Sequence, residues 1–117
     1  MMHTVLVVED EAELREMMTE ALEWSGYTVV AVDSGNAALA ALPGIEQLCL
    51  VLLDLLMPDM NGWELLECFR ERPELRDVPV VVHSSVSTPQ VTGAVRVIRK
   101  PVELDTLMGV VREYCAA

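Results

Sequence analysis

The chain has 117 residues, of which 52% are hydrophobic, and its 19 acidic and 8 basic residues give a formal net charge of −11. This length suits one domain with a single core, which we expect to span residues 1–117. The negative charge repels nucleic acid phosphates and anionic lipid headgroups, so we expect neither direct nucleic acid binding nor membrane association. No apolar run approaches the ~18 residues of a membrane span and no basic segment precedes a long apolar stretch, so we expect a cytoplasmic protein.

Apolar runs bounded by turn residues predict five strands, at residues 5–8, 27–32, 48–54, 78–83 and about 95–98. Apolar side chains at helical spacing predict helices at residues 14–22, 37–42, 65–69 and 104–111. Strands that alternate with helices imply right-handed crossovers and a parallel sheet with helices on both faces. The sequence therefore predicts an α/β fold of the doubly wound type.

Acidic residues follow two of the predicted strands. The first strand runs directly into Glu9, Asp10 and Glu11, and the third strand ends at Asp54. Because the carboxyl ends of parallel strands meet at one edge of a sheet, we expect these carboxylates to lie close together. A pair at a few ångströms repels by ~1 kcal/mol in water and ~4 kcal/mol at an effective dielectric constant near 20. A divalent cation with oxygen ligands would offset this repulsion, and Mg²⁺ is the usual choice where phosphate is also bound.

Two further polar residues follow the remaining strands at the same predicted edge. Lys100 comes after the fifth strand and Ser84 after the fourth. A metal, an ammonium and a hydroxyl that converge on the Asp54 carboxylate would form a receptor for a phosphoryl group. Ser85 is an equal hydroxyl beside Ser84, and strand alternation allows only one of the two to face Asp54. The Lys100-Pro101 peptide bond is a candidate for the cis form, which would fix the lysine side chain.

These residues, taken in order, resemble the receiver domains of two-component response regulators, over essentially the whole chain. The similar features are the acidic pair Glu9-Asp10, the acceptor Asp54, the Met-Pro-x-Met-x-Gly loop at residues 57–62, Ser84 at the Thr/Ser position, and Lys100-Pro101 at the Lys-Pro position. Each motif alone is weak, but five in the right order at predicted strand ends are specific.

The resemblance implies a flavodoxin-like or CheY-like sheet with strand order 2-1-3-4-5 and a phosphorelay function. Asp54 would take a phosphoryl group from a phosphohistidine on a sensor histidine kinase or a histidine phosphotransfer protein. Asp10, Asp54 and the main-chain carbonyl of Leu56 would ligate Mg²⁺, with Glu9 reaching the ion through water, while Lys100 and Ser84 would contact phosphoryl oxygens. The protein would catalyse only its own phosphorylation and dephosphorylation, and its change of state would alter contacts with a downstream protein target.

The sequence departs from the family between Ser84 and Lys100. This segment is about six residues shorter than in ordinary receivers, or about one and a half helical turns. It is rich in Ser, Thr and Val with a central Pro89, which are poor helix formers. We therefore predict that the fourth helix is short or absent. Val97 also replaces the switch aromatic that the family places three residues before the lysine.

Two other function classes remain open from the sequence. A pseudo-receiver could keep the fold and the acids but bind proteins without phosphorylation, which Val97 and the short fourth segment make plausible. A Mg²⁺-dependent phosphohydrolase with Asp54 as nucleophile is disfavoured. The haloacid-dehalogenase type has an Asp-x-Asp motif, whereas Leu56 stands two residues after Asp54 here.

Residues outside these motifs suggest little chemistry. The three cysteines, Cys49, Cys68 and Cys115, show no ligand-like spacing, so we expect free thiols in a reducing cytosol. His83 has no partner at ligand spacing, and we expect it to be a packed strand residue.

Overall fold

Five parallel strands form one sheet in the order β2-β1-β3-β4-β5 within residues 3–85 and 90–115, the part of the chain that the computed structural model describes. The strands are β1 (Thr4–Val8), β2 (Thr28–Val32), β3 (Leu48–Asp54), β4 (Val80–Ser84) and β5 (Arg96–Arg99). The helices are α1 (Ala12–Trp24), α2 (Gly35–Ala41), α3 (Gly62–Arg70) and α4 (Leu104–Tyr114), with short 3-10 turns at Leu42–Gly44 and Pro73–Leu75. This order confirms the predicted doubly wound α/β sheet.

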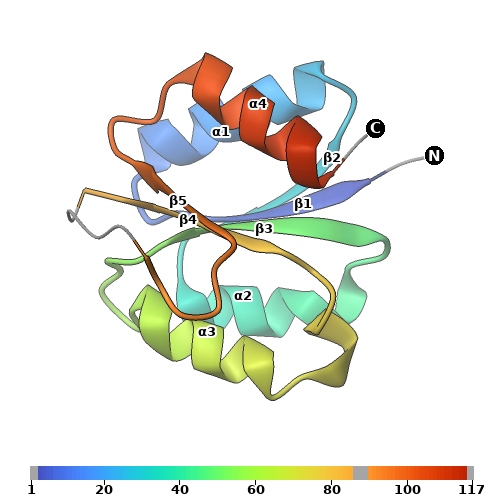
Figure 1. The fold of residues 1–117 in the computed structure, drawn as a ribbon, viewed down its shortest axis with the longest axis vertical. Helices are drawn as coiled ribbons and strands as arrows, with labels where there is room; N and C mark the ends of the chain where they lie inside the picture. The colour runs from blue at the N-terminus through green and yellow to red at the C-terminus, as the bar shows by residue number, and fades with distance from the viewer. Residues whose placement is uncertain (1–2, 86–89, 116–117) are drawn as a thin grey trace.

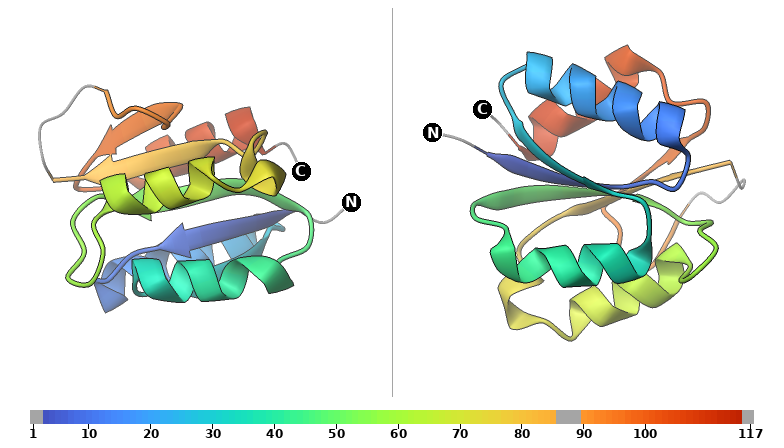
Figure 2. Two further views of the ribbon diagram at one scale, coloured as in Figure 1. Left: turned by 90° about the horizontal axis from the view of Figure 1, so that it is seen from below. Right: turned by 180° about the vertical axis from the view of Figure 1, so that it is seen from behind.

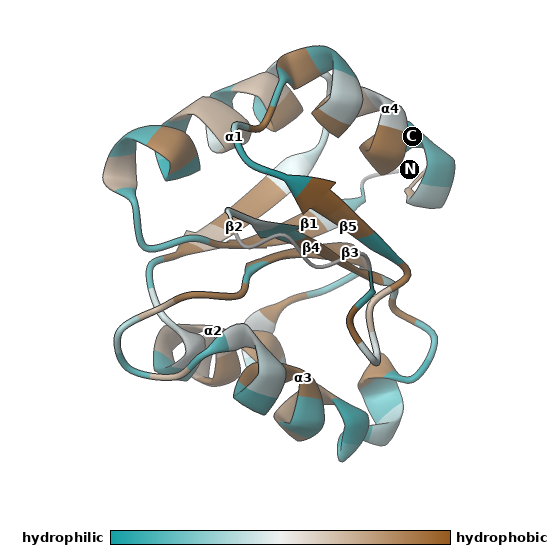
Figure 3. Cartoon of the chain, turned by 60° about the vertical axis from the view of Figure 1, so that its left-hand side comes forward, coloured by the Kyte–Doolittle hydropathy of each residue, from teal (hydrophilic) through white to brown (hydrophobic). Residues whose placement is uncertain are grey.

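Helices cover both faces of the sheet. Figures 1 and 2 show α1 and α4 on one face and α2 and α3 on the other, with the start of β1 and the end of α4 at the same end of the molecule. The hydrophobic residues are concentrated along the strands (Figure 3), as expected for strands buried on both faces.

Two aliphatic cores fill the space between the sheet and its helices. The core under α1 and α4 includes Val5, Val7, Met18, Leu22, Leu50, Leu52, Leu107 and Val111. The core under α2 and α3 includes Leu6, Val8, Ala38, Leu53, Leu65, Leu66 and Phe69. Each fully buried Val or Leu stabilises the fold by about 1.5–3 kcal/mol by leaving water. Successive side chains along a strand point to opposite faces of the sheet, so neighbouring strand residues join different cores.

The connection from β4 to β5 lacks a helix where the structure describes it, at residues 85 and 90–95, and residues 86–89 lie outside the described part. The prediction of a short or absent fourth helix is thus confirmed for the described residues. In its place, the main-chain N–H of Ala94 donates to the Val91 carbonyl, and Val95 N–H donates to Val80 O at 2.8 Å. The chain therefore enters β5 from a tight turn, and α4 is the helix that follows β5.

The fourth strand begins two residues later than the sequence predicts. Val78 N–H donates to the Leu75 carbonyl, which ends the preceding 3-10 turn, and Pro79 has no N–H to give to a sheet. Regular pairing with β3 therefore starts at Val80, which lies beside Val51. None of the described helices has both the length and the apolar character that a membrane crossing requires.

The prediction that all three cysteines are free thiols is wrong for two of them. Cys49 in β3 and Cys115 after α4 form a disulfide, and their Cα atoms lie 5.5 Å apart, within the usual range for such a bond. They are 66 positions apart in the sequence, so their spacing gave no sign of the pairing. The pair forms because α4 packs back on the sheet and returns the chain to the start of β3. Cys68 is free, as predicted.

Candidate functional site

Strand alternation brings four ionisable side chains together at the carboxyl edge of the sheet. Along β3, Leu50 and Leu52 pack in the core under α1 and α4, and Asp54 follows on the same face. The same alternation applies at the ends of β1, β4 and β5. The resulting group consists of Glu9, Asp54, His83 and Lys100.

Asp54 ends β3 with only 3% of its surface exposed. Its Oδ1 accepts a hydrogen bond from the main-chain N–H of Leu56 at 3.2 Å, and its Oδ2 lies 3.4 Å from Lys100 Nζ. Burial raises the pKa of Asp54 above its ordinary value, Lys100 opposes this shift, and the nearby Asp10 carboxyl adds to it. Asp54 is therefore a buried carboxylate held in one orientation by an amide and an ammonium.

Glu9 is fully buried beside Asp54. Its Oε2 accepts a hydrogen bond from the main-chain N–H of Glu11 at 2.9 Å, and its Oε1 lies 3.0 Å from Lys100 Nζ. Burial raises the pKa of Glu9 to about 7, an effect that the Glu11 amide and Lys100 reduce and Asp54 increases. Near neutral pH, the Glu9 carboxyl is therefore protonated in part of the molecules, which reduces the negative charge of the site.

Lys100 lies between the two buried carboxylates, at salt-bridge distance from both. Burial lowers the pKa of Lys100, but Glu9 and Asp54 outweigh burial and the net shift is upward, so the lysine stays charged. Its main-chain N–H donates to the carbonyl of Ser84 at 2.8 Å, and the Lys100-Pro101 peptide is cis, as the sequence suggested. The Lys100 ammonium therefore offsets the repulsion between the two buried carboxylates.

His83 is the residue of this group that sequence analysis did not place in the site. It is buried in β4, as predicted, but its Nδ1 lies 3.3 Å from Glu9 Oε1. Burial, together with the Lys100 charge, lowers the pKa of His83 to about 3, so the imidazole is neutral. In the register of β3 and β4, His83 lies beside Asp54, at the end of the sheet where Glu9 also lies. Knowledge of this strand register would have indicated the contact between His83 and Glu9.

The loop after Asp54 is fixed at both of its ends. Gly62 N–H donates to Leu55 O at 2.7 Å, and Asn61 caps α3 by accepting a hydrogen bond from Glu64 N–H at 2.9 Å. The Asp59 carboxylate accepts hydrogen bonds from the first amides of α2, including that of Asn36 at 3.1 Å, and this hydrogen bonding lowers the pKa of Asp59. The loop therefore holds the backbone next to Asp54 in place.

A Cβ atom on Gly62 would lie 2.8 Å from Leu55 Cα and 3.0 Å from the Asp54 carbonyl oxygen. Both of these are backbone atoms, which cannot rotate away. A glycine at this position therefore lets the first turn of α3 approach the end of β3. This close approach gives the Gly of the 57–62 motif a physical reason.

The other predicted site residues lie at the same edge. Asp10 is exposed, and the turn that carries it is held by Arg15, whose Nη1 donates to Glu9 O at 2.9 Å. Ser84 ends β4 and is fully buried, whereas Ser85 beyond it is exposed. By alternation Ser84 shares the face of Val80 and Val82.

The donor set suits a hard divalent cation. The Glu9 and Asp54 carboxylates lie at salt-bridge distance from the Lys100 ammonium, and the Asp10 carboxyl interacts with Asp54. Glu9 Oε1 is buried and, although Lys100 Nζ is close, it has no hydrogen bond of good geometry in the described structure. Glu9, Asp54 and His83 have ligand atoms within 4.8 Å of one another. Oxygen ligands with an excess of negative charge are what Mg²⁺ selects, so these residues fit that ion.

This fold and this edge define a signalling receiver module. The sequence model of the family described as "Response regulator receiver domain" matches residues 5–112, and the chain belongs to this family. Receiver domains generally bind Mg²⁺ at such an acidic site, and the response regulators that contain them interact with histidine kinases or phosphotransfer proteins. They are signalling modules and not typical enzymes.

Curated relatives and solved structures agree with this assignment. The chain is 39% identical over 85 residues to the rice "Two-component response regulator ORR7", which covers 73% of this chain and 40% of that protein. It is 38% identical to rice ORR3 over 73% of this chain and 65% of that protein, so the match spans less than two thirds of the length of these relatives.

Two solved structures resemble this fold closely. The Vibrio cholerae chemotaxis protein CheY4 superimposes with a TM-score of 0.90 at 25% identity, covering 97% of this chain and 99% of that one. The receiver domain of a signal transduction histidine kinase from Syntrophus aciditrophicus has a TM-score of 0.84 at 30% identity, covering 96% and 89%. Both therefore share the five-stranded architecture over almost the whole chain.

Proposed function

We propose that this receiver accepts a phosphoryl group on Asp54 from a phosphohistidine of a sensor histidine kinase or a histidine phosphotransfer protein. The observation that carries this proposal is the buried Asp54 carboxylate, with Lys100 Nζ 3.4 Å from Oδ2 and the Leu56 amide on Oδ1. An Asp54 oxygen forms the new bond to phosphorus while the bond from phosphorus to the histidine nitrogen breaks, and the imidazole leaves with the electron pair. Catalysis of this kind is mainly positioning and charge neutralisation.

Each residue of the site has a role in this proposal. Asp10, Asp54 and the main-chain carbonyl of Leu56 would hold Mg²⁺, and Glu9 would contribute through water. When bound, Mg²⁺ supplies positive charge that neutralises the carboxylates and the phosphoryl oxygens. Lys100 pairs with one phosphoryl oxygen, and the Ser84 hydroxyl donates a hydrogen bond to another.

The role of Lys100 follows from its position. Its ammonium already spans Glu9 and Asp54, so it neutralises part of their charge before a phosphoryl group arrives. A preorganised cation needs little rearrangement when the dianionic phosphoryl group forms, which is why such groups lower barriers effectively. Lys100 therefore neutralises the oxygens of the transferred phosphoryl group, and Asp54 forms the bond to phosphorus.

The readout of phosphorylation must differ from that of ordinary receivers. Residue 97 is a valine, and the described residues between β4 and β5 form no helix. We propose that the phosphorylated state changes protein contacts near this connection and is read by a downstream protein target in the cytoplasm. Part of the connection, residues 86–89, lies outside the described residues.

The experiment is intact mass after incubation with acetyl phosphate and Mg²⁺. We expect a gain of one phosphoryl group in the parent chain, no gain without Mg²⁺, and no gain in Asp54→Asn. The matched control is Asp77→Asn, an exposed acid before β4, which should be phosphorylated like the parent. Circular dichroism of each variant verifies the fold.

A second candidate is a pseudo-receiver that binds proteins without phosphorylation, which Val97 and the lack of a helix among the described residues between β4 and β5 favour. An intact fold with no mass gain, in the presence of Mg²⁺ and donor, would support this candidate and overturn phosphoacceptance.

A further inference from the structure

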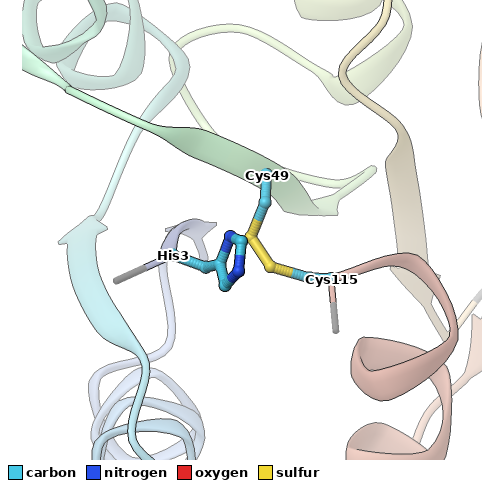
Figure 4. Close-up of side chains that lie close together, drawn as sticks. All are labelled: His3, Cys49 and Cys115. Carbon is cyan, nitrogen blue, oxygen red and sulfur yellow. A yellow bond between two sulfur atoms is a disulfide. The ribbon is translucent and has the colours of Figure 1, made fainter. Parts of the chain in front are cut away.

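A second cluster of metal-binding side chains lies at the opposite edge of the sheet from Asp54. His3 precedes β1, Cys49 is in β3, and Cys115 follows α4. Their ligand atoms lie within 4.8 Å of one another, and Figure 4 shows the His3 ring beside the two sulfurs. Nothing in the receiver function uses these three residues.

The donor atoms of this cluster differ from those of the acidic site. Two sulfurs and one imidazole nitrogen are the ligands of zinc sites, in which three protein ligands leave a fourth position for water. Mg²⁺ prefers oxygen and does not compete for thiolates. The two edges of the sheet therefore offer sites for two different classes of metal ion.

The backbone around the cluster is compatible with both a disulfide and a metal. The Cα atoms of Cys49 and Cys115 lie 5.5 Å apart. A tetrahedral zinc ion holds two sulfurs about 3.8 Å apart, at about 2.3 Å from each. Rotation of the two side chains can reach this separation once the bond between the sulfurs is broken.

Neighbouring groups hold the two cysteines in place. The Tyr27 hydroxyl donates to the Cys115 carbonyl at 2.7 Å, which fixes the backbone after α4. Cys49 Sγ lies 3.4 Å from the Thr4 carbonyl oxygen, so a reduced Cys49 thiol already has an acceptor. Cys115 is buried, while His3 and Cys49 are half-buried, so an ion can enter from the side of these two residues.

We propose that the reduced protein binds one Zn²⁺ ion through His3, Cys49 and Cys115, with water as the fourth ligand. A thiol or phosphine reductant first gives two electrons, and with two protons the disulfide becomes two thiols. Zinc then replaces the two thiol protons, which are released to solvent. Because the same sulfurs form the disulfide, zinc binding and disulfide formation exclude each other.

Such a site would link the start of β1, the start of β3 and the end of α4 in a reducing compartment, where the disulfide does not persist. The ion would take over the cross-link that the disulfide makes under oxidising conditions. The proposal does not depend on phosphorylation of Asp54, because the acidic site and this cluster share no residue.

The test is titration of the full chain with Co²⁺, a coloured substitute for Zn²⁺, after reduction with a phosphine under anaerobic conditions. We expect one sulfur-ligated Co²⁺ per chain, with sulfur-to-cobalt charge-transfer absorption and tetrahedral ligand-field bands that an equivalent of Zn²⁺ abolishes. Cys49→Ser and His3→Gln should each weaken binding by more than about tenfold, because even the loss of an outer-shell partner costs that much. The oxidised protein should give no such spectrum.

Two controls keep the outcomes separate. Cys68→Ser removes the free cysteine of the described residues and should bind like the parent, and Asp54→Asn tests the acidic site and should also bind like the parent. Loss of the signal in either control would overturn the proposal, as would a Co²⁺ spectrum without sulfur bands. His3→Gln leaves both cysteines intact, so it remains informative if Cys49→Ser does not fold.

Discussion

The Gly62→Ala substitution tests how closely α3 must approach the end of β3, which carries Asp54. The new Cβ would lie 2.8 Å from Leu55 Cα, 2.9 Å from Leu55 Cδ2 and 3.0 Å from Asp54 O. Carbon atoms in optimal contact are about 3.5–4.0 Å apart, so the helix start or the strand end must move by roughly 0.7 Å. Overpacking of this kind costs about 1–3 kcal/mol, which exceeds the gain of at most about 1 kcal/mol from replacing glycine in a helix.

We therefore expect Gly62→Ala to lower the free energy of unfolding by about 1–2 kcal/mol, measured by urea unfolding followed by circular dichroism. The same displacement shifts the Leu56 amide that holds Asp54, so phosphorylation by acetyl phosphate should also slow. The loss of stability and the slower phosphorylation would have one cause, because Leu55 and Leu56 directly follow Asp54, the proposed acceptor.

Gly109→Ala is the matched control for this prediction. Gly109 is an exposed residue inside α4, and a Cβ there would meet nothing within 4 Å. This variant should gain up to about 1 kcal/mol from helix propensity alone. The two substitutions are chemically identical, so their opposite signs isolate the close approach at Gly62. Equal or greater stability of Gly62→Ala would refute the reasoning.

Three other predictions concern the charges and the cap around the site. Burial raises the pKa of Glu9 to about 7 and lowers that of His83 to about 3, so between about pH 5 and pH 6.5 the folded protein holds an extra proton on Glu9 and lacks one on His83 relative to the unfolded chain. We compare each variant with the parent by urea unfolding in metal-free buffer. As pH rises through this window, Glu9→Gln should gain stability relative to the parent and His83→Leu should lose it, each by up to about 1.4 kcal/mol per pH unit. Slopes of the opposite sign would contradict the two pKa shifts. Lys100→Met removes the cation between Glu9 and Asp54, so we expect the free energy of unfolding to fall by roughly 2 kcal/mol at pH 7 and by less near pH 5, where Glu9 is protonated. The phosphorylation yield, measured by intact mass, should also fall. A variant as stable and as readily phosphorylated as the parent would exclude a role of Lys100 in neutralising the two carboxylates. Asn61→Ala removes the cap on the Glu64 amide and should lower the midpoint of thermal unfolding by a few degrees, from a loss of about 1 kcal/mol, and an unchanged midpoint would mean that the cap contributes nothing.

Local patterns carried most of the prediction of this fold. The run from Leu48 to Leu53 closed by Asp54, and the run from Val5 to Val8 closed by Glu9, identified strands and their carboxyl ends together. Strand and helix boundaries followed because the apolar spacing and the Gly and Pro stops act within a few residues. The larger differences were at three element ends: the fourth strand starts two residues late because the Val78 amide is engaged by the preceding turn, α3 starts three residues before Leu65, and α4 ends three residues after Val111.

The contacts that sequence analysis missed join segments far apart in the chain. The contact of His83 with Glu9 depends on strand register across β1, β3 and β4, which the alternation within one strand does not specify. The burial of Ser84 and the exposure of Ser85 depend on where β4 ends in the sheet.

The sequence by itself determined the alternating α/β architecture and the acids and lysine at the strand ends, because period, composition and turn residues are local properties of the chain. Only the tertiary structure decided that Cys49 meets Cys115 and His3, since that contact requires α4 to fold back over the sheet across 66 positions. Side chains that share an edge of the sheet through helix packing leave no periodic trace in the chain, and their chemistry becomes visible only when the layers are assembled.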